Sequence, residues 1–214
     1  MTVEDAQAHA KSMAKPSDGD STPKSPLLAG ERNCLRVDGF DLGNSPLEYV
    51  SVQDADIVFT TTNGTAAMGH CLTAKRVVIG AFTNLTAVRT FIANQSHVQI
   101  VCSGTNGAIT REDVLFAGAL ADGFDGEQND SARIAAAAWR EVCGKPPIEQ
   151  VQGLCDWLAK AFENTLGGGN LLAVGSSDDL IAAAEVDRWD FVPEFVRAEP
   201  FGFIAKMAGA TGPK

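Results

Sequence analysis

The stretch IVFTTTNGT, residues 57–65, decides the fold class of this 214-residue chain. Its β-branched and aromatic residues predict a buried strand over Ile57–Thr61, and the polar turn after it leads into a helix over Thr65–Leu72. The same order recurs twice further along the chain. The predicted strands are Arg76–Ala81 and Val98–Cys102, and the predicted helices are Leu85–Ala93 and Arg111–Leu120. Strands that alternate with helices form right-handed crossovers, so the pattern predicts a mostly parallel sheet.

Each predicted strand ends in a small polar turn. The turns are Thr62–Thr65, Thr83–Asn84 and Ser103–Gly107. In open α/β sheets, ligands bind at the carboxyl ends of the strands, where helix N-termini present free N–H groups. The three turns are therefore expected to meet at one edge that accepts anions. Asn, Gly, Ser and Thr are also the ordinary residues of turns and helix caps, so each turn taken alone is explained without a site.

The segments on either side complete the predicted organisation. Residues 1–26 are expected to form a helix, over 3–13, and a loop rich in Pro and Ser, while residues 209–214 are expected to be a frayed tail. Residues 27–208 form the α/β domain. Its C-terminal third predicts helices over 130–142, 148–163 and 176–185, with a break at Gly167–Gly169. We therefore expect a three-layer α/β/α fold with a mostly parallel sheet and a helical C-terminal part.

The charge balance restricts the partners of the chain. It carries 17 basic and 27 acidic side chains, and its formal net charge is −10. Nucleic acids and anionic membranes need a basic surface, so both are excluded as expected partners. No apolar run is long enough to span a bilayer, and residues 1–15 lack the apolar core of a secretory signal. The five scattered cysteines form no CxxC pair, which favours a cytoplasmic protein.

Five sequence blocks, taken in order, carry a resemblance to a known family. They are LLAGER (27–32), GFDLGNSPLEY (39–49), TTTNGT (60–65), CSGTNG (102–107) and EDVLFAG (112–118). The chain resembles the 2-phosphosulfolactate phosphatases, magnesium-dependent enzymes best known from coenzyme M biosynthesis. The resemblance implies that the domain over 27–208 is phosphatase-like. Such a domain would use Mg²⁺ to hydrolyse the phosphate monoester of a small anionic acid, giving sulfolactate and phosphate.

One part of the family pattern has no counterpart in this sequence. Family members begin with a strand–turn–helix unit that carries an Asp-Val-Leu-Arg-Ala-Thr-like motif. Residues 1–15 resemble the helix that would follow this unit, so an N-terminal strand–helix unit is expected to be missing. Either the start is truncated or mis-assigned, or the chain is a catalytically impaired remnant that binds a phosphorylated acid. The exposed sheet edge, together with an aromatic C-terminal tail, favours a homodimer.

Three carboxylates are the candidate Mg²⁺ ligands, because Mg²⁺ prefers one or two carboxylates beside retained waters. Glu31 ends an apolar run, where a charge needs a partner or a metal, although an exposed strand end beside Arg32 explains it equally well. Glu112 and Asp113 open a helix, where acidic residues also suit the helix dipole. Adjacent helical side chains point about 100° apart, so only one of this pair is expected to face the site.

The other candidates would hold or attack the phosphate. Asn63, Gly64 and Thr65 are expected to cradle an oxyanion, with Asn63 and Thr65 as catalytic residues. Further candidate contacts are Arg32, Ser45, Ser103, Gly104 and Thr105. Each of these also has an ordinary role in a turn, a cap or the surface. Cys102 is the third catalytic candidate, although a buried structural cysteine is the commoner role. The cysteine-phosphatase pattern C-x5-R is not formed, since position 108 is Ala108.

A second phosphatase pattern occurs at residues 54–58. Asp54-Ala55-Asp56-Ile57-Val58 matches the DxDxV motif of haloacid-dehalogenase-type phosphatases, which makes that class the enzymatic alternative. That motif has its first Asp at the end of a strand, whereas Asp54 and Asp56 precede one here. The three histidines show no metal-ligand spacing.

Overall fold

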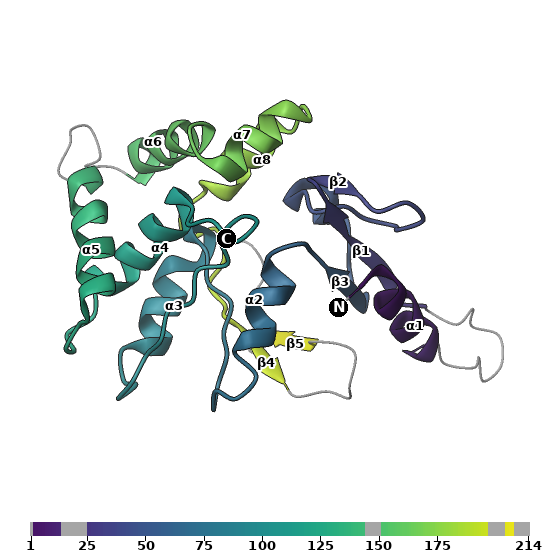
Figure 1. Cartoon of the computed structure of the whole chain (residues 1–214), viewed down its shortest axis with the longest axis horizontal. Helices are drawn as coiled ribbons and strands as arrows, with labels where there is room; N and C mark the ends of the chain where they lie inside the picture. The colour runs from purple at the N-terminus through teal and green to yellow at the C-terminus, as the bar shows by residue number, and fades with distance from the viewer. Residues whose placement is uncertain (1, 14–24, 144–150, 197–203, 208–214) are drawn as a thin grey trace.

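The computed structural model of the chain describes residues 2–13, 25–143, 151–196 and 204–207. It confirms a mixed α/β fold with two buried hydrophobic cores (Figure 1). The smaller core belongs to what we call the sheet lobe, residues 2–13 and 25–60. The larger core belongs to the helical lobe, residues 82–143 and 151–192.

The sheet lobe is built around a central strand, β1 (Leu27–Arg32). This strand pairs in parallel with β3 (Ile57–Thr60) and antiparallel with β2 (Leu35–Arg36). Gly30 lies opposite Thr60, and a Cβ atom on residue 30 would lie 1.9 Å from the Thr60 carbonyl oxygen. Only glycine therefore permits this close pairing of β1 and β3. The predicted N-terminal helix is confirmed as α1 (Val3–Met13), which packs against both strands.

The helical lobe encloses the larger core. Its helices are α3 (Leu85–Ile92), α4 (Arg111–Asp122), α5 (Asp130–Cys143), α6 (Val151–Glu163), α7 (Leu166–Ala173) and α8 (Ser177–Ala183). Leu115 of α4 and Leu158 of α6 are fully buried in this core. The helices predicted for residues 85–93, 111–120, 130–142 and 176–185 are confirmed, as is the described part of 148–163.

Short elements connect the two lobes. A 3-10 turn, η1 (Pro46–Tyr49), follows the sheet's first hairpin, and α2 (Gly64–His70) follows β3 as predicted. A second 3-10 turn, η2 (Phe82–Asn84), leads into α3. Phe82 of η2 packs against the rings of Phe116, Trp139 and Phe162, which anchors this connection in the larger core.

Two of the predicted strands are wrong. Residues 98–102 form no strand, and the side chains of Ile100 and Val101 are exposed. Residues 76–81 form only a single bridge, from Val78 to Glu194 of β4 (Pro193–Val196), which pairs with β5 (Ile204–Met207). Residues with high β propensity form a strand only where a partner strand lies in register, and local sequence does not supply the partner.

The predicted three-layer arrangement is not confirmed. Among the described residues, the central sheet has one parallel and one antiparallel strand pair, and β4 and β5 form a separate antiparallel pair, so the sheet is not mostly parallel. The break predicted at Gly167–Gly169 is also wrong, because α7 runs through it. Most of the predicted loop 16–26 and the whole tail 209–214 lie outside the described residues. None of the described helices has the length and apolar character that crossing a membrane requires.

Candidate functional site

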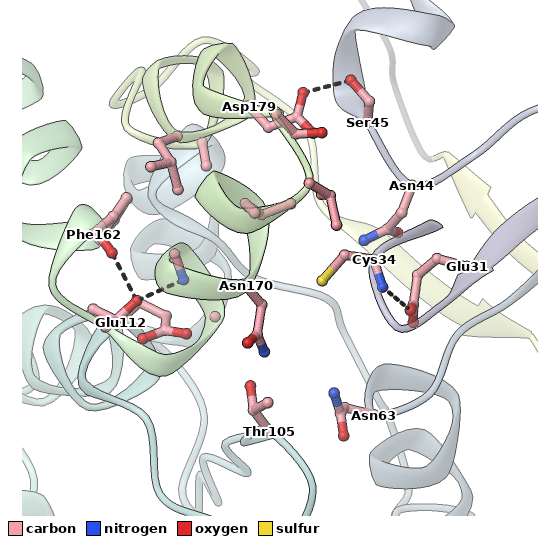
Figure 2. Close-up of a pocket in the computed structure, with 18 of the residues that line it drawn as sticks. Glu31, Cys34, Asn44, Ser45, Asn63, Thr105, Glu112, Phe162, Asn170 and Asp179 are labelled. Atoms are coloured by element: carbon pink, nitrogen blue, oxygen red, sulfur yellow. Dashed lines mark hydrogen bonds between the residues drawn. The ribbon is translucent and has the colours of Figure 1, made fainter. Parts of the chain in front are cut away.

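A cleft of about 650 Å³ lies between the sheet lobe and the helical lobe (Figure 2). One wall comes from the end of β1, from the turn after β3 and from the loop 43–48, and the other comes from the first turn of α4 and from α7 and α8. This volume suits a small ligand. Six of the predicted site residues line the cleft, namely Glu31, Ser45, Asn63, Thr105, Glu112 and Asp113.

Glu31 is buried at the end of β1, with 7% of its surface exposed. Its carboxylate accepts hydrogen bonds from the backbone N–H groups of Cys34 (3.0 Å) and Thr62 (2.8 Å), and from the Thr62 hydroxyl (3.3 Å). The alternative of an exposed strand end is therefore wrong. The Glu31 carboxylate ties the turn between β1 and β2 to the turn after β3, on the sheet-lobe wall of the cleft.

The expectation that only one of Glu112 and Asp113 faces the site is wrong, because both border the cleft at the start of α4. Their carboxylates nevertheless differ in hydrogen bonding. Asp113 Oδ2 accepts the backbone N–H of Gly104 at 2.6 Å. Glu112 Oε2 is buried and has no hydrogen-bond partner among the described residues. A buried carboxylate oxygen without a donor carries a desolvation cost, which a bound cation would offset. Of the two side chains, Glu112 has the properties expected of a metal ligand.

The predicted Mg²⁺ ligands do not form a closed metal cage. In the part of the chain that the structure describes, no group of three or more His, Cys, Asp and Glu side chains is arranged to hold a metal ion. A cage of this kind is not what Mg²⁺ requires, since Mg²⁺ usually binds one or two carboxylates and keeps several waters. The open arrangement around Glu112 fits such a site.

The turn after β3 and the turn before α4 meet at the cleft. Asn63 Oδ1 accepts the backbone N–H of Asn106 at 2.9 Å, and Thr105 closes a tight turn with Ala108. Two of the three turns that the sequence predicts to meet therefore do so. The third turn does not offer its amide, because the side chain of Asn84 is buried and bonded to backbone groups of Ala81, Ile79 and Phe191.

Ser45 and Asp179 connect the two walls of the cleft (Figure 2). Ser45 Oγ donates a hydrogen bond to Asp179 Oδ1 at 2.5 Å and accepts the backbone N–H of Leu47 at 3.3 Å. Asp179 lies in the first turn of α8, with 8% of its surface exposed. Because the Ser45 proton is already donated to Asp179, Ser45 meets a ligand as an acceptor in this arrangement.

Arg32 and Thr65 lie in a different place from the one expected. They line a second pocket, of about 400 Å³, on the side of the sheet where α1 begins. The Arg32 guanidinium donates to the Glu31 carbonyl (2.6 Å) and to the Thr60 hydroxyl (3.2 Å). Thr65 is buried and donates its hydroxyl to the Thr61 carbonyl at 2.7 Å. Gly64 begins α2 next to Thr65 and is not part of the cleft lining.

Cys102, Ser103 and Gly104 are not among the residues that line the cleft. Desolvation by surrounding atoms, together with the Asp113 carboxylate, raises the pKa of the Cys102 thiol. A thiol with a raised pKa stays protonated near neutral pH and is a weak nucleophile. The carboxylates of the DxDxV match, Asp54 and Asp56, are exposed ahead of β3, away from the cleft.

Sequence reasoning did not assign two polar residues of the helical wall to the site. Asn170 of α7 points into the cleft opposite Thr105 and Asn63 (Figure 2), and Asp179 of α8 bonds to Ser45. The glycine run 167–169 is the sequence signal beside Asn170, but local rules assign such a run to a break. Asp179 carries no local signal beyond its position near a helix start.

The cleft is strongly acidic. Among its described lining residues, Arg36 is the only cationic side chain, whereas five are carboxylates, namely Glu31, Glu48, Glu112, Asp113 and Asp179. Arg36 is largely exposed, 4.0 Å from Glu48. Like charges within a few ångströms repel strongly in a partly buried site. An anionic ligand therefore needs a bound cation, neutral hydrogen-bond donors or both.

The chain was compared with known proteins. The family model for 2-phosphosulpholactate phosphatase matches residues 2–198. A probable 2-phosphosulfolactate phosphatase of Pseudothermotoga lettingae is 36% identical over 170 residues, which are 79% of this chain and 70% of the relative. Proteins with the same description from Caldanaerobacter subterraneus subsp. tengcongensis and Deinococcus radiodurans are both 35% identical. The match to the Caldanaerobacter protein covers 78% of this chain and 68% of that relative. The match to the Deinococcus protein covers 86% of this chain and 75% of that relative.

The family model spans most of the chain and matches both walls of the cleft, from Glu31 on β1 to Asp179 on α8. The relatives exceed 30% identity over more than two thirds of the chain. The chain therefore belongs to the 2-phosphosulfolactate phosphatase family.

Proposed function

We propose that this protein hydrolyses the phosphate monoester of 2-phosphosulfolactate, with water as the second substrate. The oxygen of water bonds to phosphorus, the ester P–O bond breaks, and the leaving oxygen takes a proton, so that sulfolactate and inorganic phosphate are released. Membership of the family supports this proposal. The observation that carries it is the unpartnered Glu112 Oε2, buried at a cleft of small-ligand size.

We further propose that the reaction needs Mg²⁺. Glu112 would hold the ion, and Asp113 and Glu31 border the same cleft as additional carboxylates. When bound, the ion would neutralise charge on the phosphoryl oxygens. The acidic lining supports a cation requirement independently, because without a cation it repels a substrate with phosphate, sulfonate and carboxylate groups.

The polar turns would hold the substrate. Asn63 and Thr105 border the cleft and present neutral polar groups to it, whereas Ser45 offers the anionic groups no donor, because its proton goes to Asp179. Arg32, Gly64, Thr65, Ser103 and Gly104 lie outside the cleft lining, so the proposal gives their side chains no contact with substrate. Cys102 takes part in no chemical step of the proposed reaction, because it lies outside the cleft lining and its thiol pKa is raised.

Free thiols at Cys34, Cys71, Cys102 and Cys155 support a reducing, cytoplasmic setting. The homodimer stays a prediction.

A second candidate function is binding of a phosphorylated acid without hydrolysis. Binding alone needs only the neutral polar side chains of Asn63, Thr105 and Asn170, which line the cleft. Binding and hydrolysis differ in one observable result. A binding protein retains phosphosulfolactate and releases no phosphate from it.

The test is phosphate release from 2-phosphosulfolactate by the purified full chain, with Mg²⁺ or with EDTA. We expect release with Mg²⁺ and none with EDTA. Release at equal rates in both conditions would remove the Mg²⁺ part of the proposal. Tight binding of phosphosulfolactate without release would establish the second candidate instead.

A further inference from the structure

We propose that Asn170, together with Asn63 and Thr105, forms a neutral subsite that binds a tetrahedral oxyanion of the substrate beside Glu112. In this subsite Asn170 is a specificity-determining residue. The inference rests on the proposed function, because it assigns part of the same cleft to the anionic groups of the substrate. The subsite would bind phosphate or sulfonate oxygens, because both groups are tetrahedral anions whose oxygens accept hydrogen bonds.

The charge pattern of the cleft restricts where an oxyanion can lie. Carboxylates occupy both walls, with Glu31 on the sheet lobe and Glu112 and Asp113 on the helical lobe. Three other hydroxyls of the lining are already donated to acceptors within the protein. Ser45 bonds to Asp179, Thr62 to Glu31 and Thr165 to the Phe162 carbonyl. An oxyanion therefore has to meet donors that remain free.

Asn63 has its donor side turned to the cleft by a neighbouring backbone group. Its Oδ1 accepts the Asn106 N–H at 2.9 Å, so the amide nitrogen is directed the opposite way (Figure 2). The backbone N–H of Asn106 needs an acceptor, so the oxygen of the Asn63 amide faces it and the Nδ2 group faces away. Among the described residues no partner is bonded to Asn63 Nδ2, so both of its hydrogens are left for a ligand.

Asn170 reaches the cleft because a glycine lets the first turn of α7 pack closely against the end of α6. The N-cap Thr165 accepts the Gly168 N–H at 3.0 Å, and a Cβ atom on residue 168 would lie 1.8 Å from the Phe162 carbonyl oxygen. Only glycine therefore permits this first turn against the end of α6. Two residues later, the amide of Asn170 points between Thr105 and Asn63 (Figure 2).

A neutral amide suits this position better than a cation. An Arg or Lys next to Glu112 would pair with its carboxylate and compete with a metal ion for it. An amide donates hydrogen bonds to an oxyanion without neutralising Glu112. The subsite thus holds an oxyanion only while a cation offsets the neighbouring carboxylates, which makes anion binding depend on Mg²⁺.

The test compares anion binding by the wild type with binding by Asn170→Asp and Asn170→Ala. Inorganic phosphate and methanesulfonate are the probes, titrated calorimetrically into the full chain with Mg²⁺. Asn170→Asp keeps the shape and adds a negative charge, so we expect its phosphate affinity to fall about a hundredfold or more. Asn170→Ala removes one hydrogen bond to a charged group, and we expect a fall of about tenfold. Asn164→Ala is the matched control, because Asn164 is exposed and bonds to the Lys160 carbonyl.

Several results decide the proposal. A loss in Asn170→Asp for phosphate, or for methanesulfonate, supports the subsite and identifies which oxyanion it takes. Unchanged affinity for both probes in Asn170→Asp, with a wild-type circular dichroism spectrum, would overturn it, as would a wild type that binds neither probe. A wild type that hydrolyses no phosphosulfolactate, but whose phosphate binding is lost in Asn170→Asp, would refute only the proposed function.

Discussion

At the scale of single residues, the contrast between Glu112 and Asp113 is the most informative feature of the site. The two are neighbours in the first turn of α4, yet Asp113 is bonded to the Gly104 N–H and Glu112 keeps a buried oxygen without a donor. The angle between adjacent helical side chains predicts that only one of the two faces the site, but both border the cleft. Which of them keeps an unpartnered oxygen depends on the fold of the preceding turn, and local sequence carries no information about it.

Arg32 is a residue whose place relative to the cleft can be predicted from the sequence. Successive side chains of a strand point to opposite faces, so Glu31 and Arg32 of β1 cannot both face one cleft. Glu31 borders the large cleft, and Arg32 borders the pocket on the other side. Strand periodicity therefore already argues against using both residues in one site.

The Cys102 thiol provides a test of local electrostatics. Desolvation and the Asp113 carboxylate both raise its pKa, so its thiolate forms only at higher pH than that of an ordinary cysteine. We expect slow alkylation of Cys102 by iodoacetamide at pH 8. Asp113→Asn removes the second cause, lowers the pKa and should increase the rate severalfold, as followed by peptide mass spectrometry.

Asp125→Asn is the control, since it removes an exposed carboxylate elsewhere and should leave the rate unchanged. Alkylation of Cys102 at pH 8 as fast as that of free cysteine would contradict the raised pKa. The same data bear on the mechanism, because a thiol that stays protonated is not an effective nucleophile.

At the scale of elements, α7 shows why a glycine run is ambiguous. Glycines 167–169 lower helix propensity, and a break is the natural sequence prediction. The helix forms nevertheless, because Thr165 caps it and because only glycine at residue 168 fits against the Phe162 carbonyl at the end of α6. The close fit depends on how the chain turns between α6 and α7, which local propensity does not report. Helices α3 and α6 are predictable from sequence, because their apolar residues recur with the period of a helix and this pattern is local.

Two glycines of α7 provide a matched pair of substitutions. A Cβ atom on residue 167 would lie 2.6 Å from Glu112 Oε1, whereas one on residue 169 would meet nothing within 4 Å. Gly167→Ala should displace the Glu112 carboxylate and remove most of the thermal stabilisation that Mg²⁺ gives the protein. Gly169→Ala should keep that stabilisation and increase the free energy of unfolding by about 0.5–1 kcal/mol.

The measurement is the melting temperature of each variant with and without Mg²⁺. The substitutions are chemically identical and lie two residues apart, so helix propensity cancels in the comparison. An equal response of both variants to Mg²⁺ would mean that Gly167 does not position Glu112.

The strands show the limit of sequence prediction at this scale. Residues 57–60 and 98–102 have similar β-branched character, but only the first pairs with β1. The pairing of β1 and β3 depends on the close approach at Gly30, a contact between segments 30 residues apart. A local pattern indicates which segments suit a strand and leaves open which of them find a partner.

At the scale of the whole molecule, two separate cores meet at an acidic cleft. The hydrogen bond from Ser45 to Asp179 joins loop 43–48 to α8, across 134 residues of sequence. The bond from the Asn106 N–H to Asn63 joins the turn before α4 to the turn after β3, at another point of the cleft. These bonds fix how far the walls stand apart, which sets the space for the ligand.

Ser45→Ala tests this connection. The substitution leaves the buried Asp179 carboxylate without its hydroxyl donor, so we expect the free energy of unfolding to fall by about 1–3 kcal/mol. Urea denaturation followed by circular dichroism measures the change. Ser131→Ala, on the exposed start of α5, is the control and should change stability by less than about 0.5 kcal/mol. Equal stability of Ser45→Ala and Ser131→Ala would show that the bond does not hold the lobes.

The net charge of −10 has its main consequence at this scale as well. From composition alone it excludes nucleic acids and anionic membranes as expected partners. With the cleft in view, it means that the protein repels an anionic substrate both at a distance and at the site. A bound divalent cation offsets the repulsion at the site, which is why the proposed function depends on the carboxylate of Glu112.

The most direct test of the account is Mg²⁺-dependent phosphate release from 2-phosphosulfolactate by the wild type and by Glu112→Gln. Because Glu112→Gln removes the carboxylate charge that would hold Mg²⁺, we expect kcat/KM to fall about a hundredfold. This is equivalent to about 2.7 kcal/mol of transition-state stabilisation. Glu127→Gln, an exposed carboxylate on the loop after α4, should match the wild type. A Glu112→Gln variant that releases phosphate as fast as the wild type, with the same Mg²⁺ requirement, would contradict the account.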